Sequence, residues 1–164
     1  GCSRPVFVEW QLTQIVKLLL ERGNCKNELN AMDNNWMTAF IGACRYGHKD
    51  IVQLLLDDSS TNIDLNARSN KGLIAFMAAC RNWHKDVVKL LLDESSTNID
   101  LNARTNDGLT AFMVACYNGS TDVVKLLLDN SDPNIELNAR GIEGVTAFFS
   151  ACIEGQTIQT LSWI

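Results

Sequence analysis

Cysteine and histidine are the residue types in this chain that could do chemistry, and their spacing decides whether they do. The 164 residues include six cysteines and two histidines. An even number of cysteines is compatible with disulfides, and cysteine together with histidine is compatible with a metal site. Four cysteines recur at intervals of 36 residues: Cys44, Cys80, Cys116 and Cys152. Such even spacing indicates a structural repeat and not a cluster of ligands.

The spacing also predicts that these four cysteines do not pair with one another. Equivalent side chains on stacked helices lie about 10 Å apart, whereas a disulfide requires Cα atoms within about 7 Å. We therefore expect each thiol to fill a small buried slot beside an alanine. Cys2 and Cys25 fall outside the pattern and can be free thiols. Reduced thiols fit an intracellular, cytoplasmic protein, and without a Cys-x-x-Cys pair or a histidine cluster we expect no metal.

The two histidines occupy the same position of the repeat, at His48 and His84, and Ser120 and Gln156 take that position later. A catalytic histidine would be singular and would lie beside a nucleophile or a carboxylate. A histidine that recurs in register instead predicts a structural hydrogen bond at the turn between two helices. The chain also has no glycine-rich phosphate loop, no paired catalytic carboxylates and no nucleophile elbow. We expect no enzyme and no cofactor.

The sequence around the cysteines repeats as a whole. Residues 65–100 and 101–136 are identical at 24 of 36 positions. Every unit opens on Leu-Asn-Ala, continues with Ala-Phe and Ala-Cys, and most units end in an apolar run such as Val-Val-Lys-Leu-Leu-Leu. Self-similarity at a fixed period identifies a tandem array.

Each unit reads as two short helices, a turn and an extended, hairpin-like loop. Thr38 is the expected N-cap of a first helix, Gly47 its expected end, and Asp50 falls in the first turn of a second helix. The run 51–56 is apolar over most of the circumference of that second helix, so it must be covered on several sides. A single unit cannot cover it, which predicts an all-α repeat solenoid of stacked helix-turn-helix units with β-hairpin-like loops.

We divide the chain as one domain, 1–164, into a half-repeat, three full repeats and a last unit that is degenerate or truncated: 1–28, 29–64, 65–100, 101–136 and 137–164. The last unit departs because Ile158, Leu161 and Trp163 do not reproduce the apolar run. The start, Gly1 to Pro5, lacks an initiator Met, and no long apolar stretch comes after it. We expect no signal peptide there and interpret the start as a fragment boundary.

The units resemble ankyrin repeats over about residues 11–158. The resemblance rests on Gly108-Leu109-Thr110-Ala111-Phe112-Met113-Val114-Ala115-Cys116, Gly47-His48, Val87-Val88-Lys89-Leu90-Leu91-Leu92 and Leu101-Asn102-Ala103. Two departures are shared by the units: Thr-Ala-Phe-Met or a relative stands where the family has Thr-Pro-Leu-His, and the period is 36 instead of 33. The resemblance implies a non-catalytic protein–protein interaction module whose hairpin tips and first helices form a concave binding face.

The charge balance agrees with a protein partner. With 14 basic and 19 acidic side chains, the formal net charge is −5, which argues against nucleic acid and anionic membrane surfaces. No apolar run approaches the roughly 18 residues that a membrane span requires. We expect no membrane insertion and a monomer in solution.

Positions that differ between units are the candidates for binding, since positions that stay constant carry the packing. Aromatic residues and arginine, which dominate interface hot spots, are common among them. Trp36 and Trp83 each stand where the other three units have glycine, and a positive φ there would cost about 1 kcal/mol. Ile74 replaces a threonine cap found in the other units. The candidate partner-binding residues are Asn34, Asn35, Trp36, Met37, Arg45, Tyr46, Asn70, Lys71, Leu73, Arg81, Asn82, Trp83, Asn106, Asp107, Leu109, Tyr117 and Asn118.

Three alternatives to a natural binding module stay open on the sequence. The first is a structural role, either as a spacer or as a scaffold that associates with itself through its C-terminal end. The second is a regulatory ankyrin segment of a larger protein. The third is an engineered repeat binder, in which constant framework positions and differing surface positions are also expected.

Overall fold

The computed structural model describes residues 6–22, 28–58, 62–93, 98–130 and 135–153. These residues form eight α-helices and no strand. The helices are α1 (Val6–Glu21), α2 (Ala39–Tyr46), α3 (Lys49–Asp57), α4 (Ala75–Arg81), α5 (Lys85–Asp93), α6 (Ala111–Tyr117), α7 (Thr121–Asp129) and α8 (Ala147–Ile153). A short 3-10 turn, Ile142–Gly144, precedes α8. The tail that includes Ile158, Leu161 and Trp163 lies outside the described residues, as do Cys2 and Cys25.

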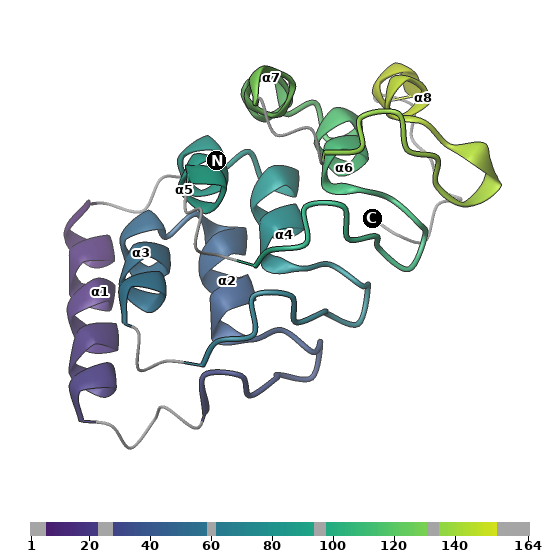
Figure 1. Ribbon diagram of the computed structural model, residues 1–164. Coiled ribbons are helices and arrows are strands. Elements are labelled where there is room, and N and C mark those ends of the chain that lie inside the picture. Colours follow the sequence, from purple (N-terminus) through teal and green to yellow (C-terminus); the bar gives the residue numbers. More distant parts are fainter. Residues whose placement is uncertain (1–5, 23–27, 59–61, 94–97, 131–134, 154–164) are drawn as a thin grey trace.

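The helices stand in two rows (Figure 1). The first helices of the units, α2, α4, α6 and α8, pack one on the next. The second helices, α1, α3, α5 and α7, form another row beside them, on the side away from the loops. The loops extend from the side of the first helices. This arrangement confirms the predicted all-α repeat solenoid, in which one continuous cluster of buried apolar side chains runs from Leu20 to Ala147 through the stacked units.

The helix ends lie where the sequence predicts them. The Thr38 hydroxyl accepts a hydrogen bond from the Ile41 backbone N–H at 3.3 Å, and Gly47 ends α2 at φ 73°. Asp50 lies in the first turn of α3. At the equivalent of Thr38 in the next unit, Ile74 makes no side-chain cap and is itself buried. Helix α4 therefore forms without this cap, and the Ile74 side chain packs into the core instead.

The cysteine prediction is confirmed for Cys44 and Cys80 and wrong for Cys152. Cys44 and Cys80 are fully buried, and burial raises the pKa of both thiols. Cys116 is half-buried and Cys152 is exposed. Cys152 lies on α8, and no described helix packs on the far side of α8. Burial therefore differs between cysteines of the same repeat position, so the residue type and its spacing alone do not determine it.

The loops are tied into a hairpin-like layer, as predicted. Within the second unit the Ser69 N–H donates to the Leu73 carbonyl oxygen at 3.0 Å. Between units the Asn70 N–H, at the tip of its loop, donates to the Asn35 carbonyl oxygen at the tip of the preceding loop, at 2.9 Å. The two later loop tips repeat this bond, from the Asn106 N–H to Lys71 and from the Ile142 N–H to Asp107. The backbone of each tip is therefore held by the tip before it.

In the first three units, the asparagine of the Leu-Asn-Ala opening joins its unit to the segment that leads into the next one. The Asn66 side-chain amide donates to the Asn98 carbonyl oxygen at 2.7 Å, and its oxygen accepts the Asp100 N–H at 2.8 Å. Asn30 makes the same pair of bonds one unit earlier. This ladder explains why the asparagine is constant, a role that the sequence analysis did not assign.

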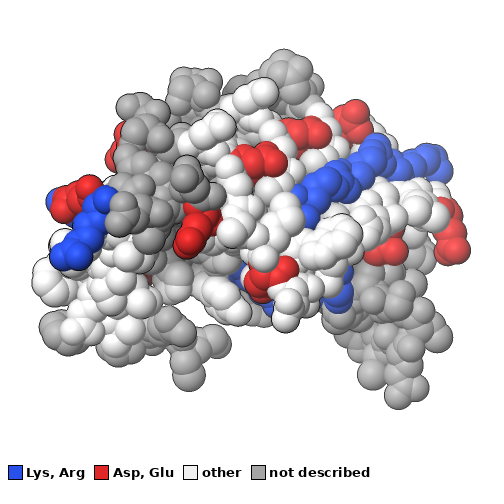
Figure 2. All heavy atoms as spheres, turned by 90° about the horizontal axis from the view of Figure 1, so that it is seen from below, with Lys and Arg blue, Asp and Glu red and all other residues white. Residues whose placement is uncertain are grey.

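Arginines join the loops in a second ladder. The Arg68 guanidinium donates to the Arg104 carbonyl oxygen, and Arg104 donates to the Arg140 carbonyl oxygen at 2.7 Å. Arg104 also forms an ion pair with Glu136 at 3.1 Å. Figure 2 shows a continuous line of basic side chains on the side of the loops, with acidic side chains as separate spots. These arginines are thus occupied in holding the loop layer together.

Candidate protein-binding face

Two grooves lie where the hairpin tips meet the ends of the first helices. The first groove, between the units 29–64 and 65–100, has a volume of about 340 Å³. It is lined by Asn35, Met37, Ile41, Arg45, Ser69, Asn70, Lys71, Leu73, Ala78, Arg81 and Asn82. The second groove, toward the unit 101–136, is smaller, with a volume of about 30 Å³. It is lined by Lys71, Leu73, Arg81, Thr105, Asp107, Leu109, Val114, Tyr117 and Asn118.

The two grooves share three lining residues, Lys71, Leu73 and Arg81. They therefore form one continuous surface across three units, which we call the concave face. Each unit contributes the same two pieces to it, a loop tip and the last turn of a first helix. Stacking places these pieces side by side although they are 36 residues apart in the sequence.

Most of the seventeen candidate residues line this surface. Leu109 is only 4% exposed and forms part of the floor. Five candidates do not line either groove: Asn34, Trp36, Tyr46, Trp83 and Asn106. Trp36, Tyr46 and Trp83 are the most exposed aromatic residues near the concave face, at 60%, 64% and 65%. They lie outside the lining of both grooves and are largely open to solvent.

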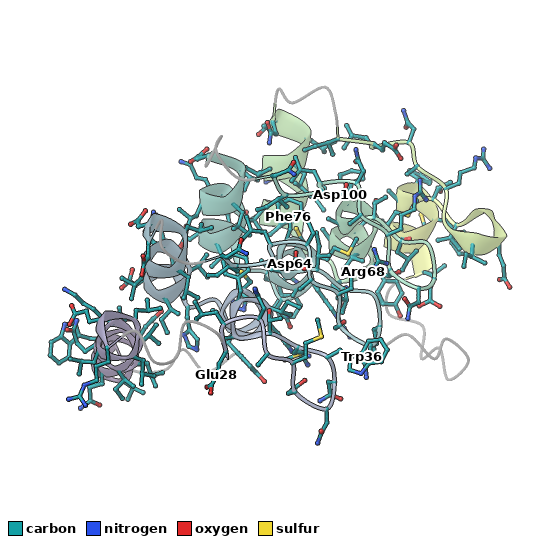
Figure 3. The ribbon with its side chains drawn as sticks, turned by 60° about the horizontal axis from the view of Figure 1, so that its bottom comes forward. Glu28, Trp36, Asp64, Arg68, Phe76 and Asp100 are labelled. Carbon is teal, nitrogen blue, oxygen red and sulfur yellow. The ribbon has the colours of Figure 1, made fainter. Side chains whose placement is uncertain are left out.

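The two tryptophans adopt the left-handed conformation that their repeat positions predict. Trp36 has φ 60° where Gly72 and Gly108 both have φ 75°, and Trp83 has φ 63° where Gly47 has φ 73°. A side chain with Cβ is strained in this region. Figure 3 shows Trp36 at the end of its loop, away from Phe76 among the helices. The strain is thus kept at the surface, where these tryptophans contribute little to the core.

Some candidate side chains already have partners within the protein. The Trp83 indole N–H donates to the Asn118 carbonyl oxygen of the next unit at 2.8 Å. The Asn82 and Asn118 amides each donate to a carbonyl of their own helix at 2.8 Å. Asn106 donates to the Asn70 carbonyl oxygen at 2.9 Å. These asparagines shape the face and keep fewer atoms for a partner than their residue type suggests.

The histidine position is structural, as the sequence predicts. His84 Nε2 donates to the Arg45 carbonyl oxygen at 2.9 Å, and the Ser120 hydroxyl donates to the Cys80 carbonyl oxygen at 3.0 Å. Both reach back to the end of the first helix in the preceding unit. His48 instead faces α1, with its Nδ1 3.7 Å from the Glu9 carboxylate oxygen Oε1.

Several lining residues are not among the seventeen candidates, including Ser69, Ala78, Thr105 and Val114. Ala78 and Val114 stand at one repeat position, where the first unit has Gly42. Variation at this position was a usable signal. Ser69 and Thr105 stand where the first unit has Asp33, and all three cap their own loops, by accepting the N–H of the residue four positions later. Because Asp, Ser and Thr are all common loop-capping residues, the variation at this position does not indicate a groove.

Charge on the concave face is uneven. Arg45, Lys71 and Arg81 line the first groove, whereas in the second groove Lys71 and Arg81 are accompanied by Asp107. Partial burial, and then the positive charge of Arg45, lower the pKa of Arg81, while Tyr117 acts in the opposite direction. Asp33 lies in the first loop, before Asn35. Its carboxylate accepts a hydrogen bond from the Met37 backbone N–H and a second one from the Asn35 backbone N–H, and these bonds, in that order of importance, lower its pKa.

A model of the family described as ankyrin repeats, in three copies, matches residues 8–105, 59–140 and 97–162. The chain belongs to the ankyrin repeat family. No curated protein matches the chain at a significant level. Ankyrin repeats are generally protein–protein interaction modules, and the family is generally non-catalytic. None of the described helices is long and apolar enough to cross a membrane, and no group of three His, Cys, Asp or Glu side chains among the described residues converges on a metal position.

Proposed function

We propose that this ankyrin-repeat chain binds another protein on its concave face and performs no catalysis. The observation that carries this proposal is the continuity of the two grooves across three units through their shared residues Lys71, Leu73 and Arg81. A surface built from repeated tips and helix ends can follow an extended segment or a ridge of a partner. The hydrogen bonds between tips hold this surface before binding, so little ordering entropy opposes association.

The residue types at the face support the same proposal. Tyr46 and Trp83 are exposed aromatics beside the grooves, and Arg45 and Arg81 line them. Aromatic and arginine side chains supply most of the energy in interface hot spots. The two tryptophans at positive φ are a local cost that the fold itself does not require, which favours a role in binding.

The test is a pull-down with the chain as bait, followed by affinity measurements on the captured partner. We expect that replacing Trp36, Tyr46, Arg81, Trp83 or Tyr117 by alanine weakens binding, by roughly 2 kcal/mol for a hot-spot residue. Helical circular dichroism should remain unchanged. The matched controls are Lys89→Ala and Lys125→Ala, exposed positions on the second helices. Normal binding by all five variants would show that the concave face is not the interface.

A second candidate, self-association end to end, is favoured by two exposed apolar surfaces. On α8, Phe148 is 82% exposed. Beside α1, an apolar groove of about 390 Å³ is lined by residues such as Leu12, Val16, Ala43 and Ile51. It lies where a further first helix would precede α2, so α8 of a second copy could occupy it. Sedimentation equilibrium decides this: a monomer at all concentrations excludes self-association, and an oligomer should dissociate on Phe148→Glu.

A further inference from the structure

We infer that the first groove takes an acidic side chain of the partner, held by Arg45 and Arg81. This inference rests on the proposed function and adds the chemistry of the partner to it. The two arginines come from equivalent positions, at the ends of α2 and α4, and Lys71 from the tip between them lines the same groove. No acidic side chain is among the described residues that line it.

The two arginines of this groove have little charge compensation among the described residues. Arg45 donates to the Met37 sulfur at 3.4 Å, and its guanidinium carbon lies 6.0 Å from the centre of the Tyr46 ring. The ion pairs of Arg104 and His48 involve neither arginine of the groove. Neither arginine of the groove has a carboxylate within ion-pair distance in the part of the chain that the structure describes. Sulfur and an aromatic face are weak substitutes for one.

The Arg81 guanidinium is half-buried and close enough to Arg45 for the two charges to repel. Burial and repulsion both disfavour the charged state of Arg81, and they lower its pKa. A carboxylate between the two guanidinium groups would remove the repulsion and satisfy their N–H donors. Arginine presents these donors in a planar fork that matches a carboxylate, and such charge-assisted hydrogen bonds are among the strongest.

The nearest acidic groups are engaged elsewhere or belong to the next groove. The Asp33 carboxylate accepts the backbone N–H groups of Asn35 and Met37 at 2.8 and 2.9 Å and lies outside the lining. Asp107 lines the second groove, which Lys71 and Arg81 also line, and it does not line the first. The groove between Arg45 and Arg81 is therefore open to an anion from outside.

The loop tips give the face a direction. One tip position reads Asn35, Lys71, Asp107 and Glu143 in successive units. Its charge changes from neutral and positive in the first two units to negative in the last two. An extended partner segment would accordingly lie with an acidic residue over the first groove and with basic residues toward Asp107 and Glu143.

The experiment is a selection of random peptides, displayed on phage, against the immobilised full chain. We expect the selected peptides to share an Asp or Glu. A synthetic peptide with that sequence should bind roughly 10- to 100-fold more weakly to the Arg45→Gln/Arg81→Gln variant, and its binding should weaken as salt rises. Replacing the shared acid of the peptide by its amide should cause the same loss on the wild type and no further loss on the variant.

The matched control is Lys89→Gln/Lys125→Gln, which makes the same change in net charge on exposed positions of the second helices. It should change affinity less than twofold, and thermal unfolding should show that both double variants fold. An equal loss in this control would overturn the inference, because binding would then follow overall charge. Peptides that depend on Tyr46 and Trp83 but not on the arginines would overturn the inference alone. If none of the selected peptides depends on Tyr46 or Trp83, both the inference and the proposed function are overturned.

Discussion

At the scale of single residues, this chain keeps two side chains in conformations that glycine would adopt at lower cost. Trp36 and Trp83 have positive φ, and both are largely exposed. Their difference lies in their contacts, since the Trp83 indole bonds to the Asn118 carbonyl oxygen of the next unit. Strain is therefore compensated in part at Trp83 and much less at Trp36.

This difference predicts unequal changes in stability when each tryptophan is replaced by glycine. We expect Trp36→Gly to raise the free energy of unfolding by about 1 kcal/mol through relief of strain. Trp83→Gly relieves similar strain but loses a hydrogen bond of about 1 kcal/mol, so its net effect should be near zero. Urea denaturation measures both. A destabilised Trp36→Gly variant would mean that this tryptophan packs usefully and that its position is not strained.

At the scale of an element, two glycines of one helix have different reasons to be there. Gly42 lies inside α2, and a Cβ built on it meets nothing within 4 Å. Gly47 ends the same helix at φ 73°, and a Cβ there would overlap the His84 ring of the next unit. The first glycine is replaceable, whereas the second is required by both the turn and the stacking.

We expect Gly42→Ala to stabilise the chain by about 0.5–1 kcal/mol, because alanine loses less entropy in a helix. Gly47→Ala should destabilise it by more than about 1 kcal/mol, because the left-handed conformation and the displaced imidazole both add a cost. Thermal unfolding of the two variants side by side gives the comparison. Equal effects would contradict the positions assigned to the two residues in α2.

At the scale of the whole molecule, the ends of the stack are covered less than its middle. Residues Ala75 to Cys80 of α4 are all buried, whereas in α8 only Ala147 and Ser150 are. In a linear array each unit is stabilised by its neighbours, so stability should fall toward an open end.

Native-state hydrogen exchange should reproduce this gradient. We expect backbone amides of α4 and α6 to exchange at least roughly tenfold more slowly than those of α8. Mass spectrometry of peptic fragments resolves the three helices. Uniform protection from α4 to α8 would show instead that the array unfolds as one cooperative unit.

The unit itself could be read from the sequence, because its rules are local. The Thr38 cap, the Gly47 turn and the positive φ of Trp36 and Trp83 could be predicted from residue types compared at a period of 36 residues. The stacking could be predicted as well, since the run 51–56 is too apolar for one unit to cover.

Only the tertiary structure decided what meets between units. It joined Arg45 to Arg81 in one groove, and it left Cys152 exposed although its residue type and spacing equal those of Cys80. The physical reason is that a repeat encodes the same unit each time, whereas contacts depend on the offset at which units stack and on the neighbour that packs against each unit. Burial, charge pairing and the shape of the concave face are therefore properties of neighbouring units together.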